Sequence, residues 1–526
     1  MDKVNRNGTY NTLSHWQNFR LKLLIQGIIV GIFSGFLIVF YRIVLEKAEE
    51  LRSFIFNLNI SKYKLMPVWF LVLVVSAYIV GILIKNEPLI SGSGIPQVEG
   101  ILVGRIQMNW LSVIMKKFIG GVISIGAGLS LGREGPSIQL GAAVGQGVSR
   151  IFKRLKFEEK YFITSGASAG LAAAFNAPLA GVMFALEEVH KHFSPLVLLS
   201  AMSASLTADF ISKHFFGLKP VFNFQNVTAL PLDKYGYIIL LGIIVGIFGV
   251  LYNLTLLKTQ EIYGKQKWLP VKFRPMIPFI TAGVFALLLP QVLGGGHPLI
   301  DSLTHGNFNM KMLLIILLFK FLFSMMSYGS GAPGGIFFPL LVLGALTGAI
   351  YGNVLVNFAA IDSRYISNFI MLAMAGYFTA IVRAPITGSI LITEMTGSFS
   401  NLLSLSVISL VAYIVADLLK SEPIYESLLE RLLKNNGQYE VAEADKNKIL
   451  LEMPVYLDSK MDGKKIRDLK LPRHCLIVGI RRGEKEVIPK GNTDIHSGDC
   501  LIVLVNENEA AATNEQLSQM CKVPNI

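Results

Sequence analysis

Long stretches without a charged side chain constrain the fold of this 526-residue chain more than any other feature. Each stretch approaches or exceeds the roughly 18–20 apolar residues that an α-helix needs to cross a bilayer. A mean hydropathy of +0.53 agrees with a chain that crosses a membrane many times. The stretches are residues 23–41, 66–84, 161–186, 235–257, 275–300 and 321–361.

Proline and glycine residues interrupt many of these stretches, for example at Pro178, Pro290, Pro333 and Pro339. Irregular backbone at membrane depth is tolerated only where it is buried in protein or lines a cavity. The pattern therefore predicts discontinuous helices, which are common in transporters.

Basic residues gather in three polar segments, 1–22, 150–160 and 258–274. The positive-inside rule predicts that these segments face the cytoplasm, and the net charge of +13 then follows from topology. No patch that mixes basic and aromatic residues suggests nucleic acid as a partner. The three cysteines fit neither a zinc pattern nor a disulfide framework, which favours a reduced cytosolic tail without a metal. We expect a multi-pass protein of the cell membrane with cytoplasmic N- and C-termini.

The membrane part contains an internal repeat. Residues 176–187 match residues 383–394 at an offset of 207, with Ala, Pro, Gly and Glu identical at corresponding places. Residues 132–145 match residues 335–348 at an offset of 203, again through shared glycines and a proline. Two halves with interrupted helices at corresponding positions predict a binding site at their interface, near the middle of the membrane.

A carboxylate among glycines stands out in Gly132-Arg133-Glu134-Gly135-Pro136. An ionisable residue at membrane depth costs about 2.5–3.5 kcal/mol by insertion scales and usually marks an ion pathway or a proton relay. The glycines let the backbone turn sharply, and a proline in the first turn suits a helix start that faces an anion. The alternative is a glycine-rich turn that carries an Arg–Glu pair.

Three further motifs favour an anion site. In Gly92-Ser93-Gly94-Ile95-Pro96, Ser93 could present its hydroxyl and neighbouring N–H groups to an anion, although an ordinary turn would have the same composition. The segment 335–339 is the repeat partner of the Glu134 motif and has Phe337 in place of the carboxylate. Tyr425 starts a helix after the last apolar stretch.

Together these motifs resemble the CLC family of chloride channels and transporters, over about residues 20–435. The resemblance implies a mostly α-helical, polytopic fold of inverted repeats with interrupted helices, and a homodimer with one pore per subunit. It also implies that chloride is the substrate, with no cofactor and no enzymatic activity. The chloride would be held by Ser93, Tyr425 and the backbone N–H groups of Ile336 and Phe337, and Glu134 would be the gating glutamate.

A second carboxylate matters for proton movement. In the resemblance, Glu188 matches the internal proton glutamate of the exchangers. Glu187 has a repeat counterpart in Glu394, whereas Met395 stands opposite Glu188, so we interpret Glu187 as structural and Glu188 as the proton-transfer group. The alternative for Glu188 is a solvated charge at a helix end. Lys117, inside an apolar stretch, is expected to be a structural partner of a buried carboxylate or carbonyl.

These residues favour a chloride/proton antiporter, with a chloride channel that lacks proton coupling as the nearest alternative. A different class, a potassium uptake subunit, is suggested by the tail and by residues 328–331, which lack the carbonyl ladder of a potassium filter. A third class is a membrane-bound sensor in which the tail is the active part.

The composition changes near residue 421, and a small soluble module follows. We predict a cytosolic N-terminal segment (1–22), a transmembrane domain (23–435), a linker (436–449) and an α/β domain (450–526). Turn signals and apolar runs predict strands at 475–480 and 501–505 and a short helix within 463–469.

The tail resembles the RCK_C, or TrkA-C, module of potassium-transport regulators. The residues that carry this resemblance are 463–469, 477–482, 488–493 and 498–499. In that family the module dimerises, and some members bind cyclic di-AMP at the dimer interface. The resemblance would place a nucleotide against Leu476, Ile480, Arg481, Arg482 and Pro489, with an arginine supplying phosphate or base contacts. The alternative is a dimerisation module without a ligand.

Overall fold

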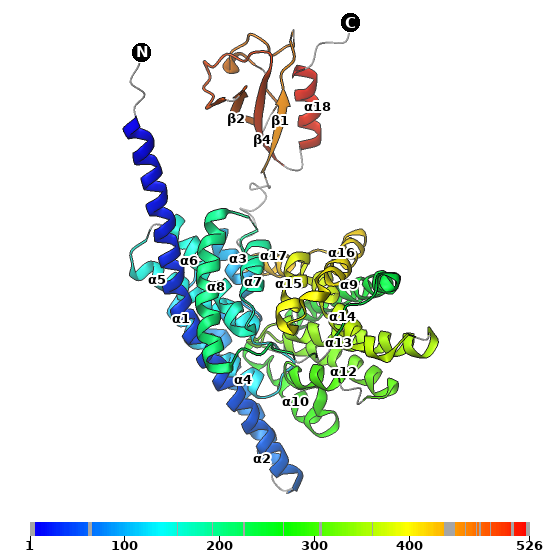
Figure 1. Ribbon diagram of the computed structural model, residues 1–526. Coiled ribbons are helices and arrows are strands. Elements are labelled where there is room, and N and C mark those ends of the chain that lie inside the picture. Colours follow the sequence, from blue (N-terminus) through cyan, green and yellow to red (C-terminus); the bar gives the residue numbers. More distant parts are fainter. Residues whose placement is uncertain are drawn as a thin grey trace. The chain divides into compact units, whose positions relative to one another are not determined.

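The chain divides into two compact units in the computed structural model, Met1–Arg431 and Leu432–Ile526, here called the membrane unit and the tail unit (Figure 1). Side chains are described from Arg20 onward, except at 57–61, 156, 157, 435, 510 and 511. Most of the predicted linker (436–447) and the end of the predicted tail domain (522–526) lie outside the described residues. The structure describes residues 6–61, 66–154, 156–191, 193–222, 224, 227–266, 268–304, 308–359, 361–435, 448–457, 459–469, 471–472, 475–483, 485–506 and 510–521.

The membrane unit consists of two sets of eight helices, followed by α17 (Ile424–Asn435). The first set is α1 (Arg6–Ser61), α2 (Met66–Asn86), α3 (Ile95–Leu102), α4 (Trp110–Gly126), α5 (Glu134–Ile151), α6 (Lys156–Phe175), α7 (Pro178–Phe184) and α8 (Pro195–Phe216). The second set is α9 (Tyr235–Lys265), α10 (Met276–Leu288), α11 (His297–Thr304), α12 (Met310–Gly329), α13 (Phe337–Phe358), α14 (Ile366–Val382), α15 (Pro385–Thr396) and α16 (Leu402–Leu418).

The two sets pack in the same way. Helix α5 packs on α6, α6 on α8 and α1 on α8, and the equivalent helices of the second set pair as α13 with α14, α14 with α16 and α9 with α16. The sets also meet each other where α5 contacts α13 and α7 contacts α15. The internal repeat read from the sequence is therefore a repeat of structure, and the mostly helical fold of two repeats is confirmed.

The shared glycines of the repeat let buried helices cross closely. A Cβ atom on Gly141 of α5 would collide with the carbonyl oxygen of Gly166 on α6. In the second repeat, a Cβ on Gly344 of α13 would lie 2.8 Å from the carbonyl oxygen of Ala373 on α14. Such contacts replace the hydrophobic effect as the source of helix association in lipid, because they let backbones approach each other.

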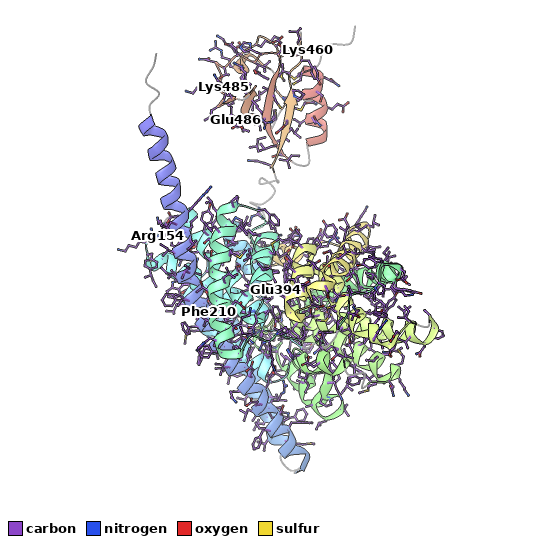
Figure 2. All side chains as sticks on the ribbon, in the orientation of Figure 1. Arg154, Phe210, Glu394, Lys460, Lys485 and Glu486 are labelled. Atoms are coloured by element: carbon purple, nitrogen blue, oxygen red, sulfur yellow. The ribbon has the colours of Figure 1, made fainter. Side chains whose placement is uncertain are left out.

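Nine helices among the described residues are long and apolar enough to cross a membrane. Their outward faces carry exposed apolar side chains, as lipid contact requires. Phe210 on α8, which is 76% exposed, lies on the outer surface of the membrane unit (Figure 2).

The predicted interruptions occur at three of the four prolines. The stretch 161–186 breaks before Pro178, 275–300 breaks at Pro290, and Pro333 lies in the loop between α12 and α13. Pro339 is different, because it lies in the first turn of α13 rather than at a break. A proline is tolerated there because the N–H groups of the first turn have no partner within the helix.

The tail unit is a four-stranded antiparallel sheet in the order β1-β4-β2-β3, with one helix. The strands are β1 (Lys448–Pro454), β2 (Cys475–Arg482), β3 (Lys485–Val487) and β4 (Asp499–Asn506), and the helix is α18 (Ala510–Cys521). Alternate residues of β4, together with Leu517 of α18, form a buried core on one face of the sheet. The two predicted strands are found as β2 and β4, and the predicted short helix is a 3-10 turn at Ile466–Asp468.

An ion pair joins Arg482, the last residue of β2, to the buried carboxylate of Asp499, the first residue of β4. Arg482 donates two hydrogen bonds of 2.8 Å to Asp499 and one to the carbonyl oxygen of Asp494. Burial raises the pKa of the Asp499 carboxyl, but the hydrogen bonds from Arg482 and from the N–H group of His496 outweigh burial and lower the pKa overall. The pair therefore stabilises the folded tail at neutral pH, and this stabilisation is lost as pH falls through the lowered pKa.

Candidate functional site

The two repeats meet at a pair of reciprocal backbone hydrogen bonds. The N–H group of Gly132 donates to the carbonyl oxygen of Gly335, and Gly335 donates back to Gly132, each over 2.7 Å. The two segments run antiparallel at this point. Both positions are tight: a Cβ on Gly132 would collide with the Glu134 carboxylate, and one on Gly335 would lie 3.1 Å from the nitrogen of Gly135.

This junction places the first residues of α5 and α13 beside each other. Glu134 begins α5 and Phe337 begins α13, and both side chains are completely buried. The backbone N–H groups of Glu134 and Phe338 lie near the Glu134 carboxylate, but neither reaches full hydrogen-bond geometry. A helix start carries about half a positive charge and free N–H groups, so two of them make a place where an anion is stabilised without a full cation.

The Ser93 loop packs directly against the start of α5. A Cβ on Gly135 would lie 2.8 Å from the Cβ atom of Ser93, so only glycine allows this approach. Gly94 adopts a left-handed conformation (φ 94°) just before α3 begins at Ile95. Ser93 is 1% exposed, and its Oγ accepts a hydrogen bond from the N–H group of Ile95 over 3.3 Å.

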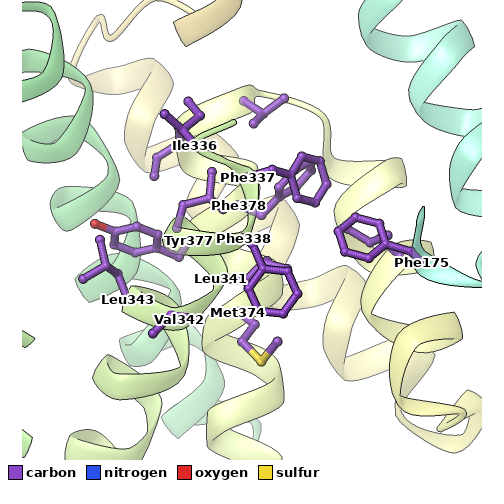
Figure 3. Close-up of a cluster of buried hydrophobic side chains, with 14 of the residues drawn as sticks. Phe175, Ile336, Phe337, Phe338, Leu341, Val342, Leu343, Met374, Tyr377 and Phe378 are labelled. Atoms are coloured by element: carbon purple, nitrogen blue, oxygen red, sulfur yellow. The ribbon is translucent and has the colours of Figure 1, made fainter. Parts of the chain in front are cut away.

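Tyr425 is connected to the start of α13 through aromatic rings. Its ring lies edge-on to Phe184 with centroids 6.5 Å apart, and Phe184 lies 6.1 Å from Phe337. Phe337 in turn packs against Phe175 and Phe378, as Figure 3 shows. The Tyr425 hydroxyl is buried and has no hydrogen-bond partner among the described residues. The structure thus brings Ser93, Glu134, Ile336, Phe337 and Tyr425 to one region of the membrane unit.

Two buried lysines hold the loops that precede α3 and α11. Lys117 donates to the carbonyl oxygens of Ile90 (2.9 Å) and Gly92 (2.7 Å). Lys320, at the repeat offset of 203, donates to those of Val292 (2.9 Å) and Gly294 (2.7 Å). The structural role expected for Lys117 is therefore confirmed, with carbonyl groups as its partners.

Glu187 and Glu394 bind the helix starts of each other's repeat. Glu187 accepts from the N–H groups of Ile386 (3.2 Å) and Thr387 (2.7 Å) at the start of α15. Glu394 accepts from those of Leu179 (3.1 Å) and Ala180 (2.8 Å) at the start of α7. Both carboxylates are used for capping, which agrees with the structural interpretation of Glu187.

Glu188 is a buried carboxylate in a π-helical turn, Ala185–Val189, that continues α7. It is 4% exposed, and its Oε1 has no hydrogen-bond partner among the described residues. Such π-turns are rare and frequently occur at functional sites. Its burial argues against the solvated helix-end charge that the sequence left open.

A cavity of about 580 Å³ opens beside Glu134. The Gly294–Gly296 loop, His297 and Phe338 form part of its wall, and the His297 ring stacks on Phe338 with centroids 5.8 Å apart. Charged side chains also line it: Arg42, Glu46, Glu49, Arg52, Arg133 and Lys219. An ion could approach Glu134 through this polar space.

The tail residues expected to bind a nucleotide do not all share one surface. Leu476 is 61% exposed and Arg481 is exposed, with its guanidinium 3.3 Å from Glu452. Ile480 is completely buried in the tail core, so its side chain is not available to a ligand. Arg482 is held by Asp499, and Pro489 is half-buried in the segment after β3. Of the five residues only Ile480 is completely buried, and Arg482 stays 40% exposed although Asp499 engages its guanidinium.

No group of three His, Cys, Asp or Glu side chains that could hold a metal occurs within the described part of the chain. The membrane unit instead offers N–H groups, hydroxyls and buried carboxylates, which are the groups expected of an ion-transport protein. Residues 75–417 match the family described as voltage gated chloride channel, and residues 450–518 match the TrkA-C domain. The chain belongs to the voltage gated chloride channel family, and the resemblance read from the motifs is confirmed for both parts.

Two relatives span most of the chain. The H(+)/Cl(-) exchange transporter ClcA of Vibrio cholerae serotype O1 (strain M66-2) is 35% identical over 427 residues, covering 78% of this chain and 90% of the relative. The transporter of the same name from Yersinia pestis bv. Antiqua (strain Angola) is 34% identical over 428 residues, covering 80% and 89%.

Solved structures agree with this membership. The X-ray structure of a slow cyanobacterial Cl−/H+ antiporter matches with a TM-score of 0.74 at 31% identity, over 78% of this chain and 98% of that chain. A CLC-type fluoride/proton antiporter matches with a TM-score of 0.65 at 23% identity, over 77% and 97%, and shows a shared fold.

Sequence reasoning missed two features of this region. Lys320 was overlooked although it stands at the same offset of 203 that relates the glycine motifs. Glu99, which lies 3.9 Å from Lys191, was not connected with Glu188, because residues 89 positions apart show no pattern along the chain.

The repeat-related lysines give a matched pair of substitutions. Lys117→Met and Lys320→Met each remove two hydrogen bonds to buried carbonyl groups, so each should lower the stability of the protein by about 2 kcal/mol. After Lys117→Met the carbonyl oxygen of Gly92 still accepts a hydrogen bond from the N–H group of Gly334. Only Lys117 holds the loop that leads into Ser93. Lys117→Met should therefore also weaken chloride binding several-fold in calorimetry, whereas Lys320→Met should leave it unchanged. Equal chloride affinity in the two variants would show that Lys117 does not affect the anion site.

Proposed function

We propose that the protein exchanges chloride for protons across the membrane, with one anion pathway in each subunit of a homodimer. One observation carries the proposal. The fully buried carboxylate of Glu134 lies where the starts of α5 and α13 meet, beside a hydroxyl-bearing loop. Exchange is also the activity named for the relatives and for the cyanobacterial structure.

We assign the anion site to Ser93, Tyr425 and the N–H groups of Ile336 and Phe337. The Tyr425 hydroxyl is buried without a partner among the described residues, so it is free to donate a hydrogen bond to a bound anion. Helix starts and hydroxyls compensate for lost hydration more mildly than a full cation does, so the ion can leave again. Phe337 supplies only its backbone, since its side chain packs among aromatic rings.

Glu134 competes with chloride in this proposal. As a carboxylate it lies near the N–H groups of Glu134 and Phe338, at the same two helix starts that we assign to chloride, and as a neutral acid it no longer needs them. Chloride entry thus favours the protonated form of Glu134, and proton loss favours chloride exit. Two anions that compete for one set of donors are coupled thermodynamically, because each lowers the affinity for the other.

Glu188 is proposed to carry protons between Glu134 and the cytoplasm. It is buried but lies at the end of the π-turn, near the exposed side chain of Lys191. Basic residues at 150–160 and 258–274 favour a cytoplasmic location for this side of the membrane unit by the positive-inside rule. Both chain termini would then be cytoplasmic as well.

Two alternatives are weighed against exchange. A chloride channel on the same fold would have no use for a second buried carboxylate, so Glu188 favours exchange. A potassium uptake subunit is disfavoured, because the family match covers the membrane unit and only the tail resembles the potassium-transport regulators. Flux of chloride, potassium and protons in proteoliposomes separates these functions.

Glu134→Gln should abolish proton movement while chloride continues to pass. An amide of nearly the same size neither binds a proton at physiological pH nor competes as an anion for the helix starts. Chloride-driven proton uptake, followed with a pH dye in proteoliposomes, should fall to the level of empty vesicles. Coupled uptake that survives in this variant would overturn the role of Glu134.

Glu188→Gln should also stop proton movement and leave chloride flux. Its matched control is Glu187→Gln, the neighbouring carboxylate that caps α15 and is expected to affect stability more than coupling. Proton and chloride fluxes should be measured on the same vesicles, which gives the coupling ratio for both variants. Normal coupling in Glu188→Gln, or loss of coupling only in Glu187→Gln, would contradict the assignment.

We further propose that the tail units pair in the homodimer and bind cyclic di-AMP. An apolar row crosses the sheet face opposite the core, from Leu450 through Leu504 to Leu476, and its two ends are about 60% exposed. Exposed apolar rows of this kind usually mark an interaction surface. Arg481 lies on the same face and could pair with a phosphate group.

Full-length protein should bind cyclic di-AMP with a measurable heat, and the ligand should change chloride flux. Arg481→Ala should reduce the affinity at least tenfold. Arg467→Ala removes another exposed arginine of the tail unit and should have no effect. An absence of heat with the full-length protein would leave the tail as a dimerisation module, and binding without a change in flux would contradict regulation.

A further inference from the structure

Lys191 lies between charged groups on three different segments. Its Nζ atom is 3.9 Å from the buried carboxylate of Glu99 on α3 and forms an ion pair with Glu426 on α17. Lys191 itself follows the π-turn that carries Glu188. The two helices that it joins are the ones that begin beside Ser93 and at Tyr425, the two proposed hydroxyl donors.

The carboxylates around Lys191 are unusually poor in other partners. Glu99 is 2% exposed, and neither of its oxygens has a hydrogen-bond partner among the described residues. Glu188 is 4% exposed, and its Oε1 also lacks one. Buried carboxylates without hydrogen bonds are costly as anions, so a nearby cation strongly affects whether they hold a proton.

The backbone of Lys191 is strained. It adopts a left-handed conformation (φ 55°) that costs a lysine roughly 1 kcal/mol or more. A glycine would satisfy this turn at lower cost. The strain is retained together with a side chain that reaches two carboxylates, which points to a role for that side chain.

We infer that Lys191 is a positioning residue. It links Glu99 and Glu188, the proton acceptors, to α3 and α17, the helices that begin at the proposed hydroxyl donors. Its positive charge favours the ionised forms of Glu99 and Glu188, and its ion pair with Glu426 fixes α17. When a proton arrives on these carboxylates, Lys191 is held less strongly by α3, and the positions of α3 and α17 relative to each other change. Ser93 and Tyr425 would respond together.

The inference rests on the proposed chloride/proton exchange and has a defined pH dependence. Lys191 favours proton release, so removing its charge lets the carboxylates hold protons at higher pH. The negative charge of Glu426 opposes proton release from these carboxylates. Its effect is smaller, since its side chain is 49% exposed and screened by water. The titratable and charged groups around Glu188 are Glu99 on α3, Tyr425 and Glu426 on α17, and Glu187, His190 and Lys191 on its own segment.

The test measures coupled transport in proteoliposomes as a function of internal pH. Lys191→Met should move the midpoint of the profile to higher pH by about one unit, as expected for loss of an opposite charge within about 4–6 Å. Glu426→Gln should move it to lower pH. Lys191→Arg should restore the wild-type midpoint, because it keeps the charge.

Two variants separate charge from backbone strain. Lys191→Gly removes the charge and relieves the left-handed backbone, and it should shift the midpoint as Lys191→Met does. Lys420→Met alters another exposed lysine with a positive φ (53°) and should leave the midpoint unchanged. A midpoint that stays at the wild-type value in Lys191→Met, or that moves in the same direction in Lys191→Met and Glu426→Gln, would overturn the inference.

The result can be distinguished from failure of the proposed function. If Glu188→Gln uncouples protons but Lys191→Met leaves the profile in place, exchange through Glu188 stands and the role of Lys191 is wrong. If Glu188→Gln remains coupled while Lys191→Met still shifts the midpoint, the role of Lys191 stands and the proton acceptor is Glu99.

Discussion

The rest of the membrane unit depends on the two hydrogen bonds that Gly132 and Gly335 exchange. They satisfy backbone groups that would otherwise be orphaned in a water-free interior, and they fix the start of α5 against the start of α13. A side chain at Gly132 would displace the Glu134 carboxylate, and one at Gly335 would crowd the backbone of Gly135. Every other feature of the site is placed relative to this junction: Glu134 two residues beyond one glycine, Phe337 two residues beyond the other, and the Ser93 loop against Gly135.

Arg133 lies 4.0 Å from the Glu134 carboxylate, but the two buried lysines of the membrane unit do not face the proposed anion site. Lys117 and Lys320 are completely buried, and each donates hydrogen bonds to two carbonyl groups of the loop that it holds. Glu187 and Glu394 likewise use their charge on N–H groups of the opposite repeat. These charged side chains thus hold the backbone in place, while helix starts and hydroxyls form the proposed anion site. Partial charges of this kind would bind chloride loosely enough for transport.

The sequence was sufficient for the motifs, the repeat and the fold class, because glycine and proline positions reflect backbone constraints directly. It could not reveal contacts that cross between the repeats. The offset of 207 equates Glu187 with Glu394, but it does not indicate that each carboxylate caps the other repeat. In the tail, the central strands β2 and β4 were predictable, whereas β1 was not, because as an edge strand it depends on its pairing with β4. The core position of Ile480 depends on the bulge near Gly479, which shifts the alternation of β2.

Differences between the repeats are as informative as their similarity. The two repeats share buried lysines, glutamate caps and glycine helix crossings. These symmetric residues serve packing and the placement of helix starts. The symmetry fails at Glu134 opposite Phe337, at Glu188 opposite Met395, and at Lys191 opposite Ser398. Each of these exceptions adds an ionisable group to the first repeat. The proposed exchange needs titratable groups along one route in addition to a symmetric set of helix starts, and these exceptions would supply them from the first repeat.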